Sequence, residues 1–181
     1  LSVTVTGVTA VGRVYDATVR ASLTGSPVVT PVSGAGDSPV VTGTALAVFG
    51  DANAAANKSV TVTGYSLSGT GASNYALIQP SGLTATIAQA TLNVLANADA
   101  KLFSTADGTN FNGVSFAGFV GADTAAVVGG TLVVARSNAT TQAAGTYAGV
   151  LQASGLSAQN YAMNYVMNHV NYMKYMNYGI T

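Results

Sequence analysis

The sequence has no cysteine, no glutamate and only one histidine, His169, and each shortage removes a class of function. Without cysteine there are no disulfides, so side-chain packing and strand ladders must hold the fold. One histidine leaves little material for a nucleophile, a base and an orienting acid. The six aspartates follow no D-x-D-x-D calcium-loop spacing, and glycosidase chemistry would need two of them to face each other. We therefore predict no enzyme activity, no cofactor and no metal site.

Charge is also scarce, at 7% of the 181 residues with a formal net charge of +0. Nucleic-acid binding normally needs a basic face, and attraction to anionic lipid needs a polybasic segment. The sequence has neither, and no apolar run approaches the ~18 residues of a membrane helix. We expect no nucleic-acid partner and no membrane insertion. No signal peptide is recognisable at the start, so the chain is interpreted as a mature or excised piece of a longer protein.

Residues typical of strands and turns are abundant, among them 21 glycines. In the stretch 57–76, Val60 and Val62 alternate with serine and threonine, Gly64 breaks the run, and a turn rich in Gly, Ser and Asn follows. Such alternation of β-branched and polar residues predicts half-buried strands. The one helix-like patch of the first half, 51–57, is too short for more than a single turn. The predicted fold class is all-β.

The tripeptide Asn-Tyr-Ala occurs at 74–76 and again at 160–162. The turns and strands around it keep the same order, which indicates two tandem modules rather than a solenoid. We place these modules at 1–94 and 95–181, as β-sandwich-like (Ig-like) domains with a β-grasp-like topology as the alternative. The predicted core consists of Val60, Val62, Tyr65, Leu67, Leu77 and Ile87 in the first module, and of Phe116, Phe119, Val127, Leu132, Val134, Tyr147 and Leu151 in the second.

The motif Tyr15-Asp16-Ala17, followed by ANKSVTVTGYSLSGTGASNYAL and LTATIAQATLNV, resembles the YDG domain of large bacterial surface proteins. That family usually has Tyr-Asp-Gly here, and alanine resists the positive φ that glycine accepts. The second half, with ADAKLFSTADG and AAGTYAGVLQASGLSAQNYA, resembles the related MBG-type repeat, in which Phe103-Ser104 replaces the usual Tyr-Gly pair. The resemblance implies filamentous-haemagglutinin-like exoproteins and adhesins on the bacterial cell surface, whose repeated modules form a stalk. It supplies no catalytic residues.

The C-terminal segment 167–181 is atypical of both resemblances because it is rich in Asn, Tyr and Met. The resemblance implies a closing strand at 161–166. Beyond it, the asparagines follow a helical spacing, whereas Asn, Tyr and Val are poor helix formers, and we expect extended structure. The methionines and the histidine are soft ligands of the kind that bind Cu(I), although a methionine stripe is more often core. The candidate interaction surface is Tyr165, His169, Tyr172, Tyr175 and Tyr178.

Three functional hypotheses follow. The leading one is a non-catalytic stalk segment of a secreted bacterial adhesin, whose partners are neighbouring modules. The second is a self-assembling extracellular filament subunit, because a segment with little charge and no proline can add a strand to the edge of another copy. The third is a carbohydrate-binding module, because exposed tyrosines stack on sugars of host or surface glycans. Tyrosines within alternating stretches are expected to be buried or half-buried instead, namely Tyr15, Tyr65, Tyr75 and Tyr147.

Overall fold

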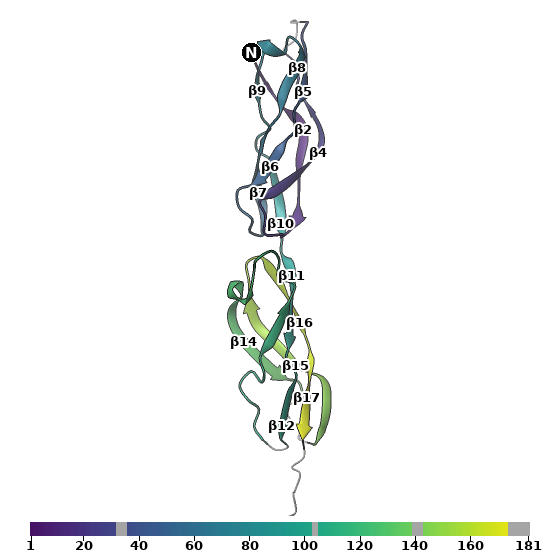
Figure 1. Cartoon of the computed structure of the whole chain (residues 1–181), viewed down its shortest axis with the longest axis vertical. Helices are drawn as coiled ribbons and strands as arrows, with labels where there is room; N and C mark the ends of the chain where they lie inside the picture. Colours follow the sequence, from purple (N-terminus) through teal and green to yellow (C-terminus); the bar gives the residue numbers. More distant parts are fainter. Residues whose placement is uncertain (32–35, 103–104, 139–142, 174–181) are drawn as a thin grey trace, which may run out of the picture. The chain divides into compact units, whose positions relative to one another are not determined.

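The computed structural model describes residues 1–31, 36–102, 105–138 and 143–173. The chain separates into two compact units, Leu1–Gln89 and Ala90–Thr181, and both are built from β-strands (Figure 1). Helical structure within the described ranges is limited to two 3₁₀ turns, η1 (Ala72–Asn74) and η2 (Ala125–Val127). The all-β prediction is confirmed, whereas a helix of the kind that covers a β-grasp sheet is not found in these ranges. A search of the same residues finds no helix long and apolar enough to span a bilayer.

The first unit is organised around a six-stranded sheet in the order β2-β4-β6-β7-β10-β3, with two-stranded sheets β1-β9 and β5-β8 beside it. Gly43, between β5 and β6, and Gly64, between β7 and β8, both have positive φ (88° and 94°). A Cβ on either would collide with the backbone of the opposite segment, so only glycine lets the paired strands leave one sheet for the other here. The strands are β1 (Ser2–Thr4), β2 (Thr6–Val11), β3 (Arg13–Val14), β4 (Arg20–Val28), β5 (Ser38–Thr42), β6 (Leu46–Phe49), β7 (Ala55–Thr63), β8 (Ser66–Thr70), β9 (Ala76–Ile78) and β10 (Thr84–Ala88).

The core of the first unit follows the predicted alternation. Val60 and Val62 are buried on one face of β7, and Ile87 is buried on β10, as predicted. The other predicted core residues of this unit, Tyr65, Leu67 and Leu77, are half-buried. Tyr15 and Tyr75, which were expected to be buried or half-buried, are both buried. Residues that the prediction omitted complete the core: Val3, Val5, Val8, Ala47 and Phe49.

The second unit contains a three-stranded sheet in the order β13-β11-β16 and a four-stranded sheet in the order β12-β17-β15-β14. Val94 and Ala96 from the first sheet, and Leu151 and Val170 from the second, are fully buried in one cluster, so the core lies between the sheets. The strands are β11 (Ala90–Ala96), β12 (Asp99–Leu102), β13 (Val114–Ala117), β14 (Gly129–Arg136), β15 (Gly145–Ser157), β16 (Tyr161–Val166) and β17 (Asn168–Met173).

The predicted core of the second unit is correct for most residues and wrong for one. Val134 and Leu151 are buried, and Phe116, Phe119, Leu132 and Tyr147 are half-buried. Val127 is 42% exposed because it closes the 3₁₀ turn η2 instead of lying in a strand. Val127 lies in the apolar run 125–128, which does not show which side chains face inward, and a single turn of 3₁₀ helix presents one side to solvent.

The division between the units lies at Gln89 and Ala90, not at the predicted 94–95. The strand β11 pairs with β13 and β16, which are both in the second unit, so it belongs there. The separation of 167–181 as an atypical tail also needs correction in part. Its residues up to Met173 form β17, which pairs with β12 on one side and β15 on the other. The expected extended structure is thus confirmed for β17, and 174–181 lie outside the described residues.

Each unit pairs its first and last segments in parallel. In the first unit, β1 pairs with β9 and β3 pairs with β10, both at the same offset in sequence (76 − 2 = 87 − 13). In the second unit, β11 pairs with β16 and β12 pairs with β17, again at one shared offset (161 − 90 = 170 − 99). The Asn-Tyr-Ala motif opens the returning strand in both cases, which confirms the internal repeat.

Candidate functional site

The five tyrosine and histidine residues predicted to form an interaction surface do not share one strand or one sheet. Tyr165 is on β16 in the three-stranded sheet, whereas His169 and Tyr172 are on β17 in the four-stranded sheet. The backbone of Tyr172 lies opposite Lys101 on one side and Gly145 on the other. The remaining two predicted residues, Tyr175 and Tyr178, lie outside the described residues.

Tyr165 is occupied within its own unit. Its hydroxyl donates to the Leu156 carbonyl (3.0 Å) and accepts from the Leu156 amide (2.8 Å), while the side chain packs against the buried cluster. This pair of bonds ties β16 to the end of β15. Tyr165 is therefore a structural residue whose ring is half-buried.

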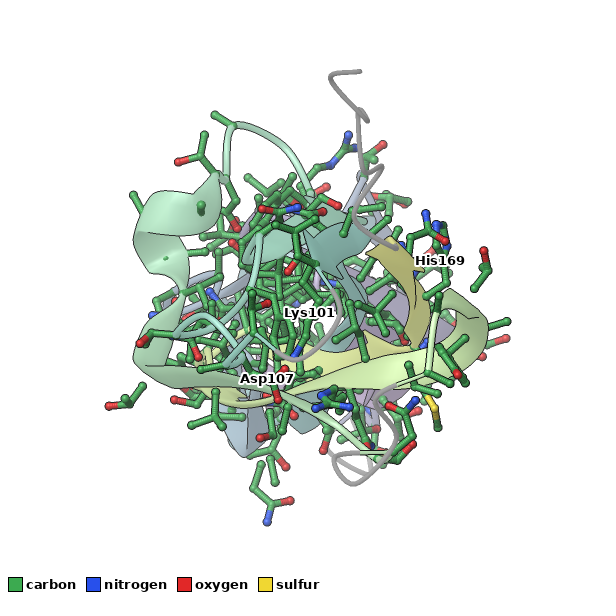
Figure 2. The ribbon with its side chains drawn as sticks, turned by 90° about the horizontal axis from the view of Figure 1, so that it is seen from below. Lys101, Asp107 and His169 are labelled. Atoms are coloured by element: carbon green, nitrogen blue, oxygen red, sulfur yellow. The ribbon has the colours of Figure 1, made fainter. Side chains whose placement is uncertain are left out.

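His169 is half-buried, and its backbone amide donates to the side chain of Asn168 (2.9 Å). It lies well apart from Lys101 and Asp107 (Figure 2). Among the described residues there is no group of three or more His, Cys, Asp or Glu side chains that could hold a metal ion. The two methionines that precede His169, one in β16 and one just after that strand, differ, because Met163 packs against the core and Met167 is 54% exposed.

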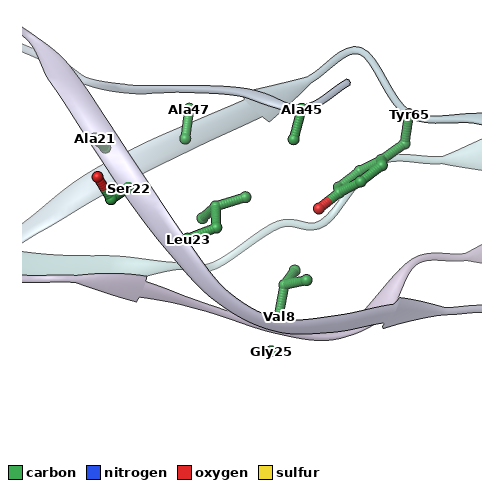
Figure 3. Close-up of a pocket in the computed structure, with 8 residues that line it drawn as sticks. All are labelled: Val8, Ala21, Ser22, Leu23, Gly25, Ala45, Ala47 and Tyr65. Carbon is green, nitrogen blue, oxygen red and sulfur yellow. The ribbon is translucent and has the colours of Figure 1, made fainter. Parts of the chain in front are cut away.

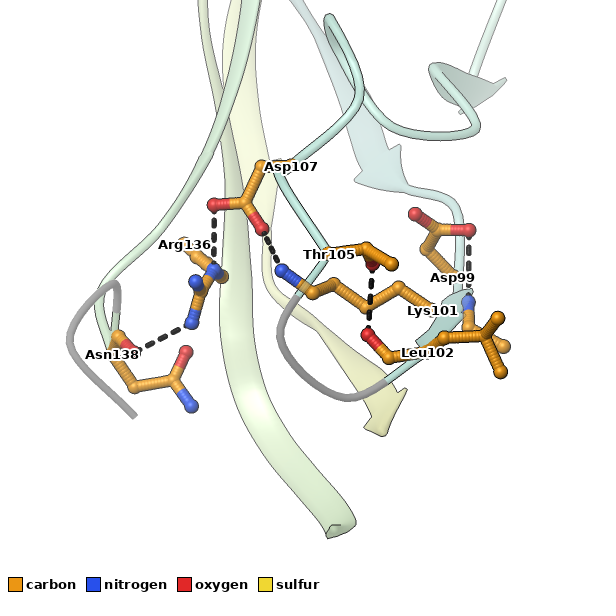
Figure 4. A network of polar contacts seen from close by, with 8 residues as sticks. Asp99, Lys101, Leu102, Thr105, Asp107, Arg136 and Asn138 are labelled. Atoms are coloured by element: carbon orange, nitrogen blue, oxygen red, sulfur yellow. Dashed lines mark hydrogen bonds and ion pairs between the residues drawn. The ribbon is translucent and has the colours of Figure 1, made fainter. Parts of the chain in front are cut away.

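The most buried charges lie in the second unit, around Asp107. Its carboxylate accepts one hydrogen bond from Lys101 and one from Arg136, both at 2.7 Å (Figure 4). The Arg136 guanidinium also donates to the Asn138 carbonyl (2.7 Å), and its side chain is only 3% exposed. One carboxylate therefore joins β12 to the end of β14 through two cations.

The surroundings of Asp107 decide its ionisation. Burial alone raises the pKa of Asp107, but hydrogen bonds from Arg136 and Lys101, together with their charges, outweigh burial and lower the pKa below its ordinary value of 3.8. The group is therefore a fixed anion at neutral pH. A carboxylate held charged by two cations is poorly suited to act as a general acid or base, and its role is structural.

The first unit has a similar ion-pair cluster, centred on an aspartate of the YDG-like motif. Asp16 forms an ion pair with Arg13 and accepts hydrogen bonds from the amide and hydroxyl of Thr18 (2.9 and 2.8 Å), which makes it a turn-capping aspartate. Burial raises the pKa of Asp16, but these partners outweigh it and lower the pKa. The guanidinium of Arg13 lies 5.4 Å from the ring centre of Phe49, a cation–π distance.

Ala17, where the YDG family usually has glycine, adopts φ = 61°. This left-handed conformation is the one that glycine accepts without cost and alanine resists. The turn geometry has therefore kept the shape suited to glycine although the glycine is absent. The burial of Tyr15 and the bonds of Asp16 hold the turn in this shape.

The tyrosine of each Asn-Tyr-Ala motif is a core residue. Tyr161 is 2% exposed; its hydroxyl donates to Asp123 (2.7 Å) and accepts from the Val120 amide (2.9 Å). Its ring meets Phe119 edge to face, with 5.7 Å between the ring centres. Tyr75, at the equivalent place in the first unit, is 8% exposed. These tyrosines fasten the returning strands and are not available to stack on a sugar.

The first unit has an open depression of about 390 Å³ (Figure 3). Most of the side chains around it are small and apolar, and the hydroxyl of Tyr65 points into it (Figure 3). No charged side chain lines it, and the residues around it are Val8, Ala21, Ser22, Leu23, Gly25, Ala45, Ala47 and Tyr65. A single tyrosine and one serine hydroxyl offer little to orient a polar ligand.

Local sequence patterns identify the Asp107 cluster only in part. Lys101 and Asp107 are close in sequence, but Arg136 comes from a strand 29 residues further along, and no local pattern connects it to them. The YDG-like turn, by contrast, is contained within residues 13–18, and a motif search can find it.

Comparison with protein families matches residues 1–85 to the YDG domain and residues 92–170 to the MBG domain (YGX type). No curated protein and no solved structure matches the chain. The two family matches fall within the two units of the structure, and the second ends at Val170 inside β17. The family models thus find a YDG domain followed by an MBG domain of the YGX type in this chain.

Proposed function

We propose that this chain is a non-catalytic spacer, a stalk segment of a large secreted adhesin on the bacterial cell surface. The observation that carries the proposal is the parallel pairing of the first and last segments in each unit. When two such segments run parallel, the chain enters the unit at one end of the pair and leaves at the other end. Within each unit, the entry and the exit of the chain are then separated by the length of that unit.

That length can be estimated from the strands. The paired segment spans Ser2 to Val14 in the first unit and Ala90 to Leu102 in the second. Twelve residue steps of about 3.3 Å separate the ends of each segment, or about 40 Å per unit. Only Gln89 lies between the last strand of the first unit and the first strand of the second. With a linker of one residue, nearly all of the chain belongs to one of the two modules.

The ionisable groups support a structural role as well. Four of the six basic residues, Arg13, Lys58, Lys101 and Arg136, are bound to aspartates within their own unit. Asp107, the most enclosed of the carboxylates in these pairs, is held as an anion between two of those cations. The surface context, extracellular and adhesive, rests on the resemblance of the two domains to modules of bacterial exoproteins.

Light scattering on the purified chain over a wide concentration range tests the spacer against its alternatives. A spacer remains a monomer at every concentration. Fibres or a concentration-dependent mass would support the filament subunit in its place. A glycan-array signal that disappears in the Tyr175→Ala, Tyr178→Ala double variant would support the carbohydrate-binding module.

The distance over which the chain can present a binding tip tests the stalk function directly. One or three copies of the chain are displayed on bacteria between a membrane anchor and a small binding tip, and capture of target beads through a surface polymer layer is measured. The spacer predicts that capture rises with copy number more steeply than with Gly/Ser linkers of equal residue count, which coil. Equal capture by the two series would refute it.

A further inference from the structure

We infer that each unit is a mechanical clamp, in which the parallel pairing of the first and last segments resists unfolding when the chain is pulled from its two ends. This inference rests on the proposed spacer function, because a stalk between a cell and an attached surface is under tension. It adds a specific property, the direction and order in which the units resist force.

The geometry gives the direction of the resistance. Tension pulls the first segment of a unit toward its N-terminal end and the last segment toward its C-terminal end. In a parallel pair these two pulls act in opposite directions along the same axis, so they slide the strands past each other. The ladder hydrogen bonds lie across that axis and are loaded together, whereas pulling the strands apart from one end would break them one after another.

The register between the two segments is constant within each unit. The offset in sequence is the same for β11 with β16 and for β12 with β17, although the segments change sheets between these pairings. The same holds in the first unit for β1 with β9 and for β3 with β10. In the second unit the two segments therefore move from one sheet to the other side by side. In the first unit the stretch between the two pairings forms β2, which pairs with β4, so the clamp there consists of two separate ladders at one register.

Further bonds join the two segments of the second unit at both ends of β16. The Ala90 amide donates to the Asn160 carbonyl (3.0 Å), and the Asn168 side chain donates to the Ala96 carbonyl (2.9 Å). Between them, the Asn164 side chain donates to that of Asn93 (2.6 Å). Asn168, one of the asparagines that make 167–181 atypical, thus strengthens the pairing.

The two clamps differ in extent. The first unit aligns three residue pairs between β1 and β9 and two between β3 and β10, or five pairs. The second aligns six pairs between β11 and β16 and four between β12 and β17, or ten pairs. More bonds must rupture together in the second unit, so it should be mechanically the stronger one.

Single-molecule force measurement on the whole chain tests the clamp, because a chain without cysteine accepts handles at chosen positions. Gln89 and Gln159 are exposed and lie just before the paired strands β11 and β16. With Gln89→Cys and a handle at the C-terminus, the second unit is sheared. With Gln89→Cys and Gln159→Cys, the same two strands are peeled from their starting end, which is the matched control.

Because forced unfolding is governed by the unfolding rate, both geometries are compared at one loading rate. Shearing should require several-fold more force than peeling. With an N-terminal handle and Gln89→Cys, which shears the first unit alone, the force should lie below that of the second unit. Equal forces for shearing and peeling would overturn the clamp, and a stronger first unit would overturn the role of ladder length. Failure of the clamp and failure of the spacer proposal are distinguishable. The force measurements test the clamp alone, whereas the spacer proposal fails if the chain assembles in solution or binds a glycan.

Discussion

The two units share the parallel pairing of their first and last segments but differ in the contacts that stabilise it. The first unit aligns five residue pairs between its outer segments and forms its charged turn from neighbours in sequence, Arg13 and Asp16. The second aligns ten pairs and holds its most buried charges together over 29 residues of sequence, from Asp107 to Arg136. A repeat can therefore conserve strand order while the contacts that stabilise it move from local to long-range.

This difference indicates where each unit is vulnerable. A local turn can be altered without disturbing the strands around it, whereas a strand or charge that joins distant parts cannot. Changes to the second unit should therefore be costly and changes to the YDG-like turn small. The predictions below test that contrast, starting with the largest effect.

Ending the chain after Val166 should unfold the second unit and leave the first intact. The truncation removes β17, which lies between β12 and β15 in the four-stranded sheet, and with it Val170, which is fully buried. Loss of a central strand exposes two edges and opens the core. Hydrogen exchange followed by mass spectrometry, resolved by unit, measures the result. A chain ending after Met173 keeps β17 and is the control, and protection of the second unit in the shorter chain would contradict the prediction.

Asp107→Asn should destabilise the second unit by about 2–3 kcal/mol, because it leaves two largely buried cations without their carboxylate. The loss should fall below the ~3–5 kcal/mol typical of a broken buried ion pair because Asp107 itself is 33% exposed. Urea unfolding monitored by unit-resolved hydrogen exchange gives the change in free energy.

The matched control for that substitution is Asp51→Asn in the first unit. Asp51 pairs with Lys58 through a carboxylate that is 57% exposed, and exposed ion pairs contribute little. The loss in the first unit should be much smaller than the loss in the second. Similar losses in both would mean that burial around Asp107 has no energetic consequence.

Acid should weaken the second unit through the same carboxylate. Because the pKa of Asp107 is lower in the folded state than its ordinary value of 3.8, the stabilisation is complete well above 3.8 and is lost as the pH falls through the folded-state pKa. Thermal unfolding between pH 6 and pH 2 should show a smaller acid-dependent fall for the second unit in Asp107→Asn than in the unmodified chain. An identical fall in both would assign the acid sensitivity to other groups.

Local pattern was sufficient for the fold class and for much of the core. The alternation around Val60 and Val62 identified a buried strand face, and the repeated Asn-Tyr-Ala tripeptide identified the two modules. Both signals lie within a few residues, where periodicity of two reports which side chains face inward. They failed at Val127, where a single 3₁₀ turn interrupts the strand pattern.

Long-range pairing was not predictable from local pattern. Residues 90–96 follow the last strand of the first unit with no turn signal, and only their pairing with β13 and β16, which come later in the sequence, assigns them to the second unit. The Asn-rich segment looked foreign to the fold because asparagine is uncommon in strands. Its amides are satisfied instead by distant partners, Asn168 by Ala96 and Asn171 by Thr146 (2.7 Å), so the strand fits the sheet.

The smallest predicted effect concerns the YDG-like turn. Ala17→Gly should raise the stability of the first unit by about 0.5–1 kcal/mol. Alanine in the left-handed region costs about 1–2 kcal/mol, which glycine removes, but glycine also gives the unfolded chain more conformational entropy, which offsets part of the gain. Ala88→Gly is the matched control, since Ala88 is an exposed strand residue of β10 and the same change should cost about 0.5–1 kcal/mol there. Opposite signs for the two substitutions would show that the turn retains the geometry of the family glycine, whereas losses at both positions would show that Ala17 has relaxed into a turn of its own.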